Sequence, residues 1–141
     1  MTRALNVGIV GATGMVGEVF LQLLEKRDFP VGALKLFASQ RSQGHTRRFK
    51  GQNVSIDPLS ADGFKGLDVV FFSSGDDISK EWAPLAVEAG AVAIDNSAAF
   101  RMAENTPLVV PEVNGDILPG PGVPMLIANP NCSTIQLVMT L

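Results

Sequence analysis

The feature that most constrains the fold is a run of evenly spaced glycines between an apolar stretch and a helical pattern. The apolar stretch from Leu5 to Val10 predicts a buried strand. Gly11, Gly14 and Gly17 follow it at intervals of three residues. Apolar residues with helical spacing then predict a helix from Met15 to Lys26. A strand, a glycine turn and a helix start in this order are typical of a dinucleotide-binding unit, in which the helix N-terminus faces phosphate groups; the alternative is a glycine-rich turn that binds nothing.

Composition limits the classes of protein that fit this unit. The sequence has 141 residues, of which 46% are hydrophobic and 18% charged, and this predicts one globular domain over residues 1–141. A net charge of −3 gives no basis for binding nucleic acid or an anionic membrane, and no apolar run approaches the roughly 20 residues that span a bilayer. One Cys and one His exclude a disulfide framework and a metal site of these ligands. We therefore expect a cytoplasmic protein with a small-molecule substrate, no metal site, and no nucleic-acid or membrane partner.

Apolar runs alternate with helical patterns along the whole sequence. The predicted strands are residues 5–10, 34–38, 69–72, 91–95 and 125–128, with helices over 15–26 and 76–90, a third helix beginning after 134, and a hairpin over 48–57 that turns at 50–53. Pro84 requires the second helix to begin nearer Trp82 or to kink. Residues 107–114, bracketed by prolines, are predicted to be extended. This order predicts an α/β fold, a Rossmann-type, doubly wound and mostly parallel sheet with helices on both faces.

The segment after the second strand indicates which dinucleotide fits. An NAD site usually carries an acidic residue at this point, which binds the ribose 2′-OH. Here Ser39, Arg41 and Ser42 occupy the segment, and no acid is present. A guanidinium and two hydroxyls suit a 2′-phosphate, so these residues predict NADP as the cofactor. The alternative is a solvated polar loop.

Two further strands end in polar residues, and ligands of open α/β sheets bind at such carboxyl ends. Ser73 and Gly75 follow the strand at 69–72, and we expect them beside the cofactor. Asn96 to Arg101 follow the strand at 91–95 and bring a cation to the same edge. As a phosphate ligand, Arg101 would use its fork of donors; its alternative role is a surface charge.

The only cysteine, Cys132, lies between the last predicted strand and the last predicted helix. Backbone N–H groups at a helix N-terminus stabilise a thiolate, and with the amide of Asn131 they could hold an oxyanion. A buried, inert thiol is the alternative, and the neighbouring Asn, Ser and Thr residues argue against it. A dinucleotide site that ends at a nucleophilic Cys suggests hydride transfer to or from a thioester carbon.

Taken together, these segments resemble the aspartate-semialdehyde dehydrogenase family, over nearly the whole chain. The segments that carry the resemblance are residues 11–17, 38–42, 95–102, 110–114 and 129–134. The resemblance implies reductive dephosphorylation of β-aspartyl phosphate to aspartate semialdehyde by NADPH, on the route to lysine, methionine and threonine.

The resemblance also implies roles for individual residues. Cys132 matches the nucleophile that forms a thioester and expels phosphate, and Arg101 matches a ligand of the substrate phosphate, with Asn96 near it. The matching cofactor contacts are Thr13, Gly14, Met15 and Val16 at the pyrophosphate, and Arg41 and Ser42 at the 2′-phosphate.

The family has a second, α+β domain that these 141 residues do not contain. That domain carries a catalytic acid/base His, an Arg for the substrate carboxylate and most of the dimer contact, whereas His45 lies in a polar loop. We therefore expect this chain to be the N-terminal part of a homodimer or dimer of dimers, and expect residues 1–141 alone to bind NADP weakly without turnover. Three alternatives stay open. They are an N-acetyl-glutamyl-phosphate reductase, which typically has Gly where this chain has Asn131, a redox-sensing NADP-binding module that uses Cys132, and a structural domain that binds no ligand.

Overall fold

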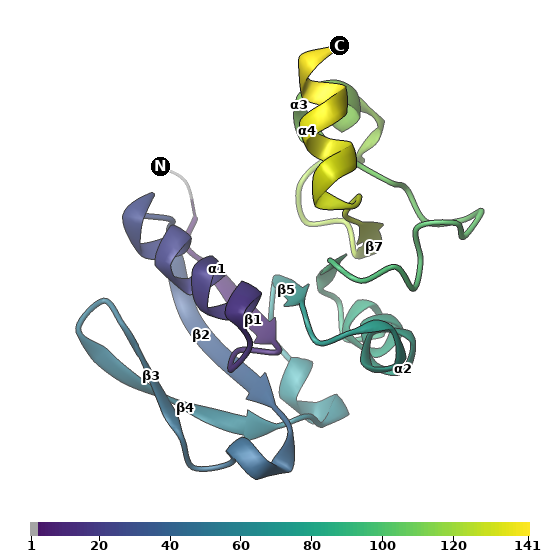
Figure 1. The fold of residues 1–141 in the computed structure, drawn as a ribbon. Helices are drawn as coiled ribbons and strands as arrows, with labels where there is room; N and C mark the ends of the chain where they lie inside the picture. The colour runs from purple at the N-terminus through teal and green to yellow at the C-terminus, as the bar shows by residue number, and fades with distance from the viewer. Residues whose placement is uncertain (1–2) are drawn as a thin grey trace.

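The structure, a computed structural model, describes residues 3–141. Its strands are β1 (Leu5–Val10), β2 (Val31–Ala38), β3 (Thr46–Phe49), β4 (Gln52–Pro58), β5 (Val69–Phe72), β6 (Val92–Asp95) and β7 (Met125–Ala128). Its α-helices are α1 (Met15–Lys26), α2 (Asp76–Glu88), α3 (Pro111–Asn114) and α4 (Cys132–Thr140), with 3-10 turns η1 (Gln40–Ser42), η2 (Ala61–Phe64) and η3 (Gly115–Ile117). The strands form one sheet in the order β3-β4-β2-β1-β5-β6-β7, in which only β3 is antiparallel to its neighbour (Figure 1).

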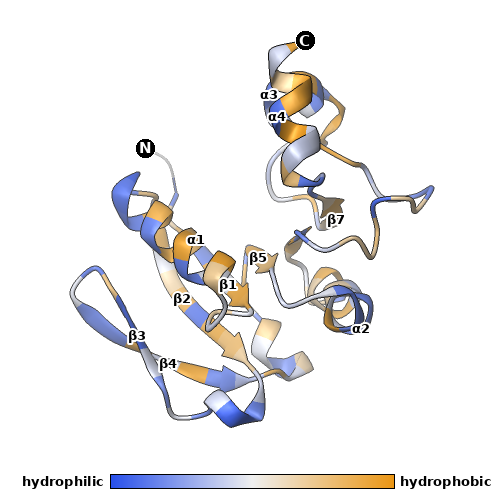
Figure 2. Cartoon of the chain, viewed as in Figure 1, coloured by the Kyte–Doolittle hydropathy of each residue, from blue (hydrophilic) through white to orange (hydrophobic). Residues whose placement is uncertain are grey.

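Helices cover both faces of this sheet, which confirms the doubly wound α/β prediction. Side chains of β1 alternate between the faces: Val7 and Ile9 pack with α1, whereas Val10 packs with α2 and η2. A strand that is buried on both faces has a continuous run of apolar residues, and Figure 2 shows such a run at the ends of β1 and β2. No helix among residues 3–141 has the length and apolarity that crossing a membrane requires.

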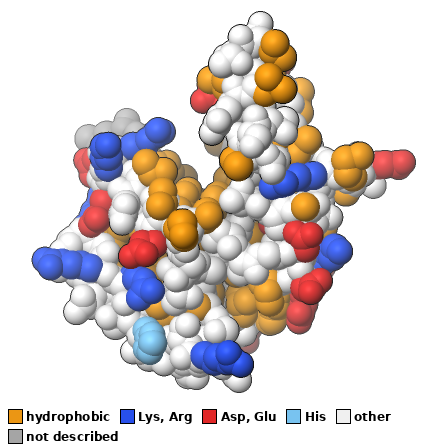
Figure 3. Space-filling view, in the orientation of Figure 1, with side chains coloured by type: hydrophobic (Ala, Val, Ile, Leu, Met, Phe, Trp, Pro, Cys, Tyr) orange, Lys and Arg blue, Asp and Glu red, His pale blue; other side chains and the backbone are white. Residues whose placement is uncertain are grey.

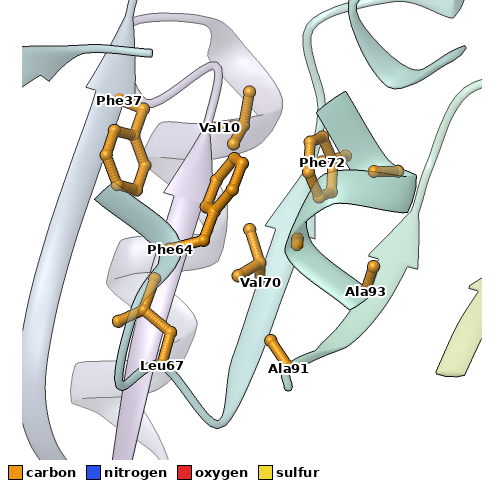
Figure 4. Close-up of a cluster of buried hydrophobic side chains, with 10 residues drawn as sticks. Val10, Phe37, Phe64, Leu67, Val70, Phe72, Ala91 and Ala93 are labelled. Atoms are coloured by element: carbon orange, nitrogen blue, oxygen red, sulfur yellow. The ribbon is translucent and has the colours of Figure 1, made fainter. Parts of the chain in front are cut away.

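The core on the α2 face is built around Phe64 of η2. Its ring meets Phe37 edge-on at 5.5 Å between centroids and Trp82 at 6.3 Å, and it lies beside Val10 and Phe72 (Figure 4). Burying an aromatic or branched apolar side chain contributes about 1.5–3 kcal/mol. This cluster therefore fixes α2 and η2 against the strand ends that form the site.

The sheet face that α1 covers is less tightly packed over β5 and β6 than the face that α2 covers. Phe20 of α1 stacks on Phe71 of β5 at 4.0 Å between ring centroids. Beside this pair lies an apolar cavity of about 320 Å³. Figure 3 shows hydrophobic side chains in the hollow between α1 and the C-terminal segment. The lining of the cavity includes Leu23, Phe29, Val69 and Ile94.

Most predicted elements are present, with shifted ends. β2 begins at Val31, three residues before the predicted start, and the edge hairpin turns on Lys50 and Gly51 alone, both with positive φ. α2 begins at Asp76 and continues through Pro84, so the alternative start near Trp82 is wrong.

The predicted extended segment at 107–114 is also wrong, because its second half is the helix α3. Pro111 is the first helical residue, where its missing N–H costs nothing. The Asn114 side chain closes the turn: its Oδ1 accepts from the Val110 N–H at 2.9 Å, and its Nδ2 donates to the Leu108 carbonyl at 3.0 Å.

Candidate active site

The carboxyl ends of the parallel strands meet at one edge of the sheet. Val10, Phe72, Asp95 and Ala128 are paired across β1, β5, β6 and β7, and the residues that follow them are Gly11, Ser73, Asn96 and Asn129. The backbone N–H groups of the last three residues donate to the carbonyl oxygens of Val10, Phe72 and Asp95, respectively, at 2.8–3.0 Å. The sequence thus brings its polar strand ends into one line, as the parallel sheet predicts.

A cavity of about 320 Å³ opens at the carboxyl ends of the neighbouring strands β1 and β5. After β1 the chain crosses to β2 on one side of this pair, and after β5 it crosses to β6 on the other side. This reversal of strand order is where open α/β sheets bind nucleotides. The lining residues are Val10, Gly11, Thr13, Gly14, Ala38, Ser39, Leu59, Ser73, Ser74 and Ile78. Five of the predicted cofactor residues are among them. Leu59 and Ile78 were not predicted, and they supply apolar wall.

The glycines of the first turn differ in what requires them. Gly11 has φ +88°, and a Cβ there would lie 2.9 Å from Ser73 Oγ. A Cβ on Gly17 would lie 2.4 Å from the Gly11 carbonyl oxygen, so close packing of α1 on the turn that follows β1 requires that glycine. A Cβ on Gly14 would make only an ordinary contact of 3.4 Å. Packing therefore does not require Gly14, whereas a ligand that approached the backbone closely would require it.

The N-terminus of α1 has donors for such a ligand. Gly14 is its N-cap residue, and no side chain caps the helix. The first N–H groups of an uncapped helix have no intrahelical acceptor, and they attract anions. The cavity wall, the glycine turn and these donors together form a site that fits a dinucleotide pyrophosphate.

The other predicted cofactor residues border the cavity instead of lining it. Met15 and Val16 begin α1, with 83% and 46% of their surface exposed. Arg41 and Ser42 belong to η1, directly after the end of β2, and Arg41 forms no ion pair with any residue from 3 to 141. Gly75 precedes α2 with φ +100°.

Arg101 is held at the same edge by backbone carbonyls. Its Nε donates to the Asn129 oxygen at 3.0 Å and its NH2 group to the Asn96 oxygen at 3.3 Å. The side chains of these two asparagines are also hydrogen-bonded to each other: Asn129 Nδ2 donates to Asn96 Oδ1 at 2.7 Å. No carboxylate within residues 3–141 pairs with Arg101, so its charge is available to an anion.

Cys132 is exposed and is the first residue of α4, which contradicts the alternative of a buried thiol. It lies three residues after the Asn129 carbonyl that binds Arg101. Asn131 is the N-cap: its Oδ1 accepts from the Ser133 N–H at 2.9 Å. This bond occupies one of the backbone N–H groups that the sequence predicts as donors to an oxyanion. The Asn131 Nδ2 group is left as a donor.

The ion pairs of the described residues lie outside this edge. They join Arg3 to Asp68, Lys50 to Asp28 and Lys65 to Asp62. The hydrogen bond and the charge of Lys50 hold the pKa of Asp28 below its ordinary value. Over residues 3–141, no three His, Cys, Asp or Glu side chains gather to hold a metal ion.

Proteins of known identity resemble the chain over almost its whole length. The aspartate-semialdehyde dehydrogenase of Aquifex aeolicus is 52% identical over 137 residues, which are 96% of this chain and 40% of that protein. Aspartate semialdehyde dehydrogenase II of Vibrio cholerae, in a crystal structure complexed with ASA, covers 99% of this chain and 45% of its own, at 44% identity and a TM-score of 0.90. The Candida albicans enzyme, in a structure with NADP, covers 96% and 45% at 29% identity, with a TM-score of 0.79. The chain spans about two fifths of the length of the curated relatives it matches.

The family comparison agrees with the resemblance seen in the sequence. The matching family is described as semialdehyde dehydrogenase, NAD binding domain, and the match covers residues 6–119. It includes the glycine turn, the loop after β2 and the loop that carries Arg101. Because the match runs from β1 to the segment before β7, the chain belongs to the semialdehyde dehydrogenase family, and residues 6–119 are its NAD-binding domain.

Proposed function

We propose that residues 1–141 supply the NADP site, the nucleophile and the phosphate site of an enzyme that reduces β-aspartyl phosphate to aspartate semialdehyde. The observation that carries this proposal is the exposed thiol of Cys132 at a helix N-terminus, three residues after the Asn129 carbonyl that anchors the guanidinium of Arg101. An acyl phosphate needs both a nucleophile and a cation for its leaving group. The relatives that bear the enzyme's name, one of them in a structure with NADP, support the choice of reaction and cofactor.

Distances along the sheet edge suit such a reaction. β7 lies three strands from β1, which is roughly 14 Å at about 4.8 Å per strand. The N-terminus of α1 would hold the pyrophosphate of a dinucleotide, and Asn96 and Cys132 lie further along the same edge. When bound there, NADPH supplies a hydride.

Residues of this chain act as the nucleophile, the oxyanion donors and the phosphate ligand in the other steps of the reaction. The Cys132 thiolate attacks the acyl carbon, an S–C bond forms, and the carbonyl electrons move to the oxygen. Asn131 Nδ2 and free N–H groups of α4 stabilise this oxyanion. The C–O bond to phosphate then breaks, and phosphate leaves with the bonding electrons toward Arg101. Reduction of the resulting thioester releases the aldehyde and returns the thiolate.

Proton transfer needs a further residue. His45, the only His of the sequence, is exposed in the loop before β3, away from the strand ends that carry Asn96 and Cys132. The acid/base is therefore supplied from outside residues 1–141 in this proposal. We further propose, from the family resemblance, a homodimer or dimer of dimers. A cytoplasmic location follows because the nucleophile must stay a free thiol, which a reducing compartment favours.

Arg41 determines the preference for NADP over NAD. In Arg41→Ala, we expect the affinity for NADP to fall about tenfold to a hundredfold, because a hydrogen-bonded charge contributes about 1.5–3 kcal/mol, while the affinity for NAD stays within about twofold. Titration of both nucleotides into the 141-residue chain, followed by fluorescence, measures this. Arg48→Ala removes an exposed charge from β3 and serves as the matched control. Equal losses for both nucleotides would contradict the assignment of the 2′-phosphate to Arg41.

A hybrid enzyme tests the proposed function as a whole. Residues 1–141 replace the matching stretch of the Vibrio cholerae relative. That stretch is 45% of the relative's chain and matches this chain with a TM-score of 0.90. We expect the hybrid enzyme to form NADPH from aspartate semialdehyde and NADP only when phosphate is present, at a rate within about tenfold of the parent. A hybrid that binds NADP and has the parent's circular dichroism, but forms no NADPH, would refute the proposal.

A further inference from the structure

A buried carboxylate with no role in the proposed reaction lies directly beneath the site. Asp95, the last residue of β6, is 0% exposed. Its Oδ1 accepts from Ser79 Oγ at 2.6 Å and from the Ser97 N–H at 3.1 Å, and its Oδ2 accepts from Ser97 Oγ at 2.7 Å. No Lys or Arg of residues 3–141 pairs with it.

Stability alone does not account for this cluster. Removing a carboxylate from water costs several kcal/mol, which hydrogen bonds offset only in part, and apolar side chains of the same volume are often as stable or more so. The neighbouring ends of β1 and β5 are apolar: Phe72 is paired with Asp95, and Val10 is paired with Phe72. A buried carboxylate at the end of one strand therefore indicates that the residue orients a neighbouring part of the chain.

What the cluster orients is the loop from Asn96 to Arg101. The Ser97 hydroxyl donates to Asp95 and also accepts from the Ala99 N–H at 3.1 Å. Asp76 Oδ1 accepts from the Ala98 N–H at 2.9 Å. Three successive N–H groups of the loop, at 97, 98 and 99, are thus fixed by side chains.

Both ends of this loop reach the phosphate site. Asn96 precedes Ser97, and its carbonyl and side chain bind Arg101 and Asn129. Arg101 closes the loop, with its N–H bonded to the Ala98 carbonyl at 3.4 Å. A shift of the loop at Ser97 therefore moves the guanidinium relative to Cys132.

We propose that Asp95 and Ser97 are positioning residues, which hold the Asn96–Arg101 loop so that Arg101 meets the phosphate group of the substrate. This inference rests on the proposed function of Arg101. Asp95 is fully buried and its oxygens are occupied by donors of the protein, so it acts through Ser97 and not on substrate.

The two serines give a matched pair of variants. Ser97→Ala and Ser79→Ala each remove one hydroxyl from the same carboxylate, but only Ser97 belongs to the loop, whereas Ser79 lies on α2. In the hybrid enzyme we expect Ser97→Ala to raise the KM for inorganic phosphate about tenfold to a hundredfold, the range that a displacement of about 1 Å produces. Ser79→Ala should leave this KM within about twofold. Ser97→Thr, which keeps the hydroxyl, should restore most of it.

A spectroscopic readout separates this inference from the proposed function. In the ¹⁵N spectrum of the 141-residue chain, the Arg101 Nε–H signal reports its bond to Asn129, and Arg101→Lys removes the signal and so assigns it. We expect Ser97→Ala to shift or broaden this signal and Ser79→Ala to preserve it, whether or not the hybrid enzyme is active. An unchanged signal in Ser97→Ala, or equal changes in both variants, would overturn the positioning role.

Discussion

Replacing Cys132 by alanine in the hybrid enzyme lowers kcat for phosphate-dependent NADPH formation by at least about 10³-fold, because no other side chain supplies the nucleophile. The thiol is exposed at the first position of α4, so its loss leaves no cavity in the core. We therefore expect the affinity for NADP and the thermal midpoint to stay at the parent values. Steady-state kinetics, a nucleotide titration and a melting curve measure the three quantities.

The control for this change is Ser133→Ala. Ser133 is also exposed in the first turn of α4, and its N–H, which bonds the Asn131 cap, is unaffected by the substitution. We expect its kcat to stay within about threefold, since a surface substitution of this kind usually has a small effect. A Cys132→Ala enzyme that kept more than about 1% of the activity would show that the thiol is not the nucleophile.

Gly17→Ala destabilises the chain by about 3 kcal/mol, at the upper end of the usual cost of overpacking. The new methyl carbon would lie 2.4 Å from the Gly11 carbonyl oxygen and 3.0 Å from Ala12 Cα, so the backbone of the turn after β1 and the first turn of α1 must separate. Urea denaturation followed by circular dichroism measures the loss in the free energy of unfolding.

Gly14→Ala is the matched substitution, with the opposite expected result. Its methyl carbon meets protein only at 3.4 Å, so no overpacking is expected, and the free energy of unfolding should fall by only about 1 kcal/mol, because Ala is a poorer N-cap residue than Gly. The affinity for NADP should fall at least about tenfold, because the methyl group occupies the approach of the pyrophosphate. A Gly14→Ala chain that binds NADP normally would remove the ligand-based reason for this glycine.

Local sequence signals predicted most of the fold. The glycine turn, the apolar runs of β1 and β5 and the helical spacing of α1 are all contained within single segments, and each has the predicted bounds. The errors arise where one residue suits two structures. Pro111 favours an extended segment as much as a helix start, and the later contacts of Asn114 decide between them.

The candidate site was predicted where it follows from strand ends and was missed where it depends on distant packing. Leu59 and Ile78 are apolar residues from separate segments, and nothing local distinguishes a cavity wall from the core. The Asp95 cluster is similar, because Ser79 lies 16 residues earlier and meets Asp95 only after α2 packs on β6. Sequence alone marked Asp95 as the end of a strand.

The most direct test of the account is the identification of the covalent intermediate. The hybrid enzyme is incubated with aspartate semialdehyde and NADP in buffer without phosphate, quenched in acid, and digested for mass spectrometry. The account predicts an aspartyl thioester on Cys132 that disappears when phosphate is added before the quench. An active hybrid enzyme whose Cys132 stays unmodified, or that carries the acyl group on another residue, would contradict it.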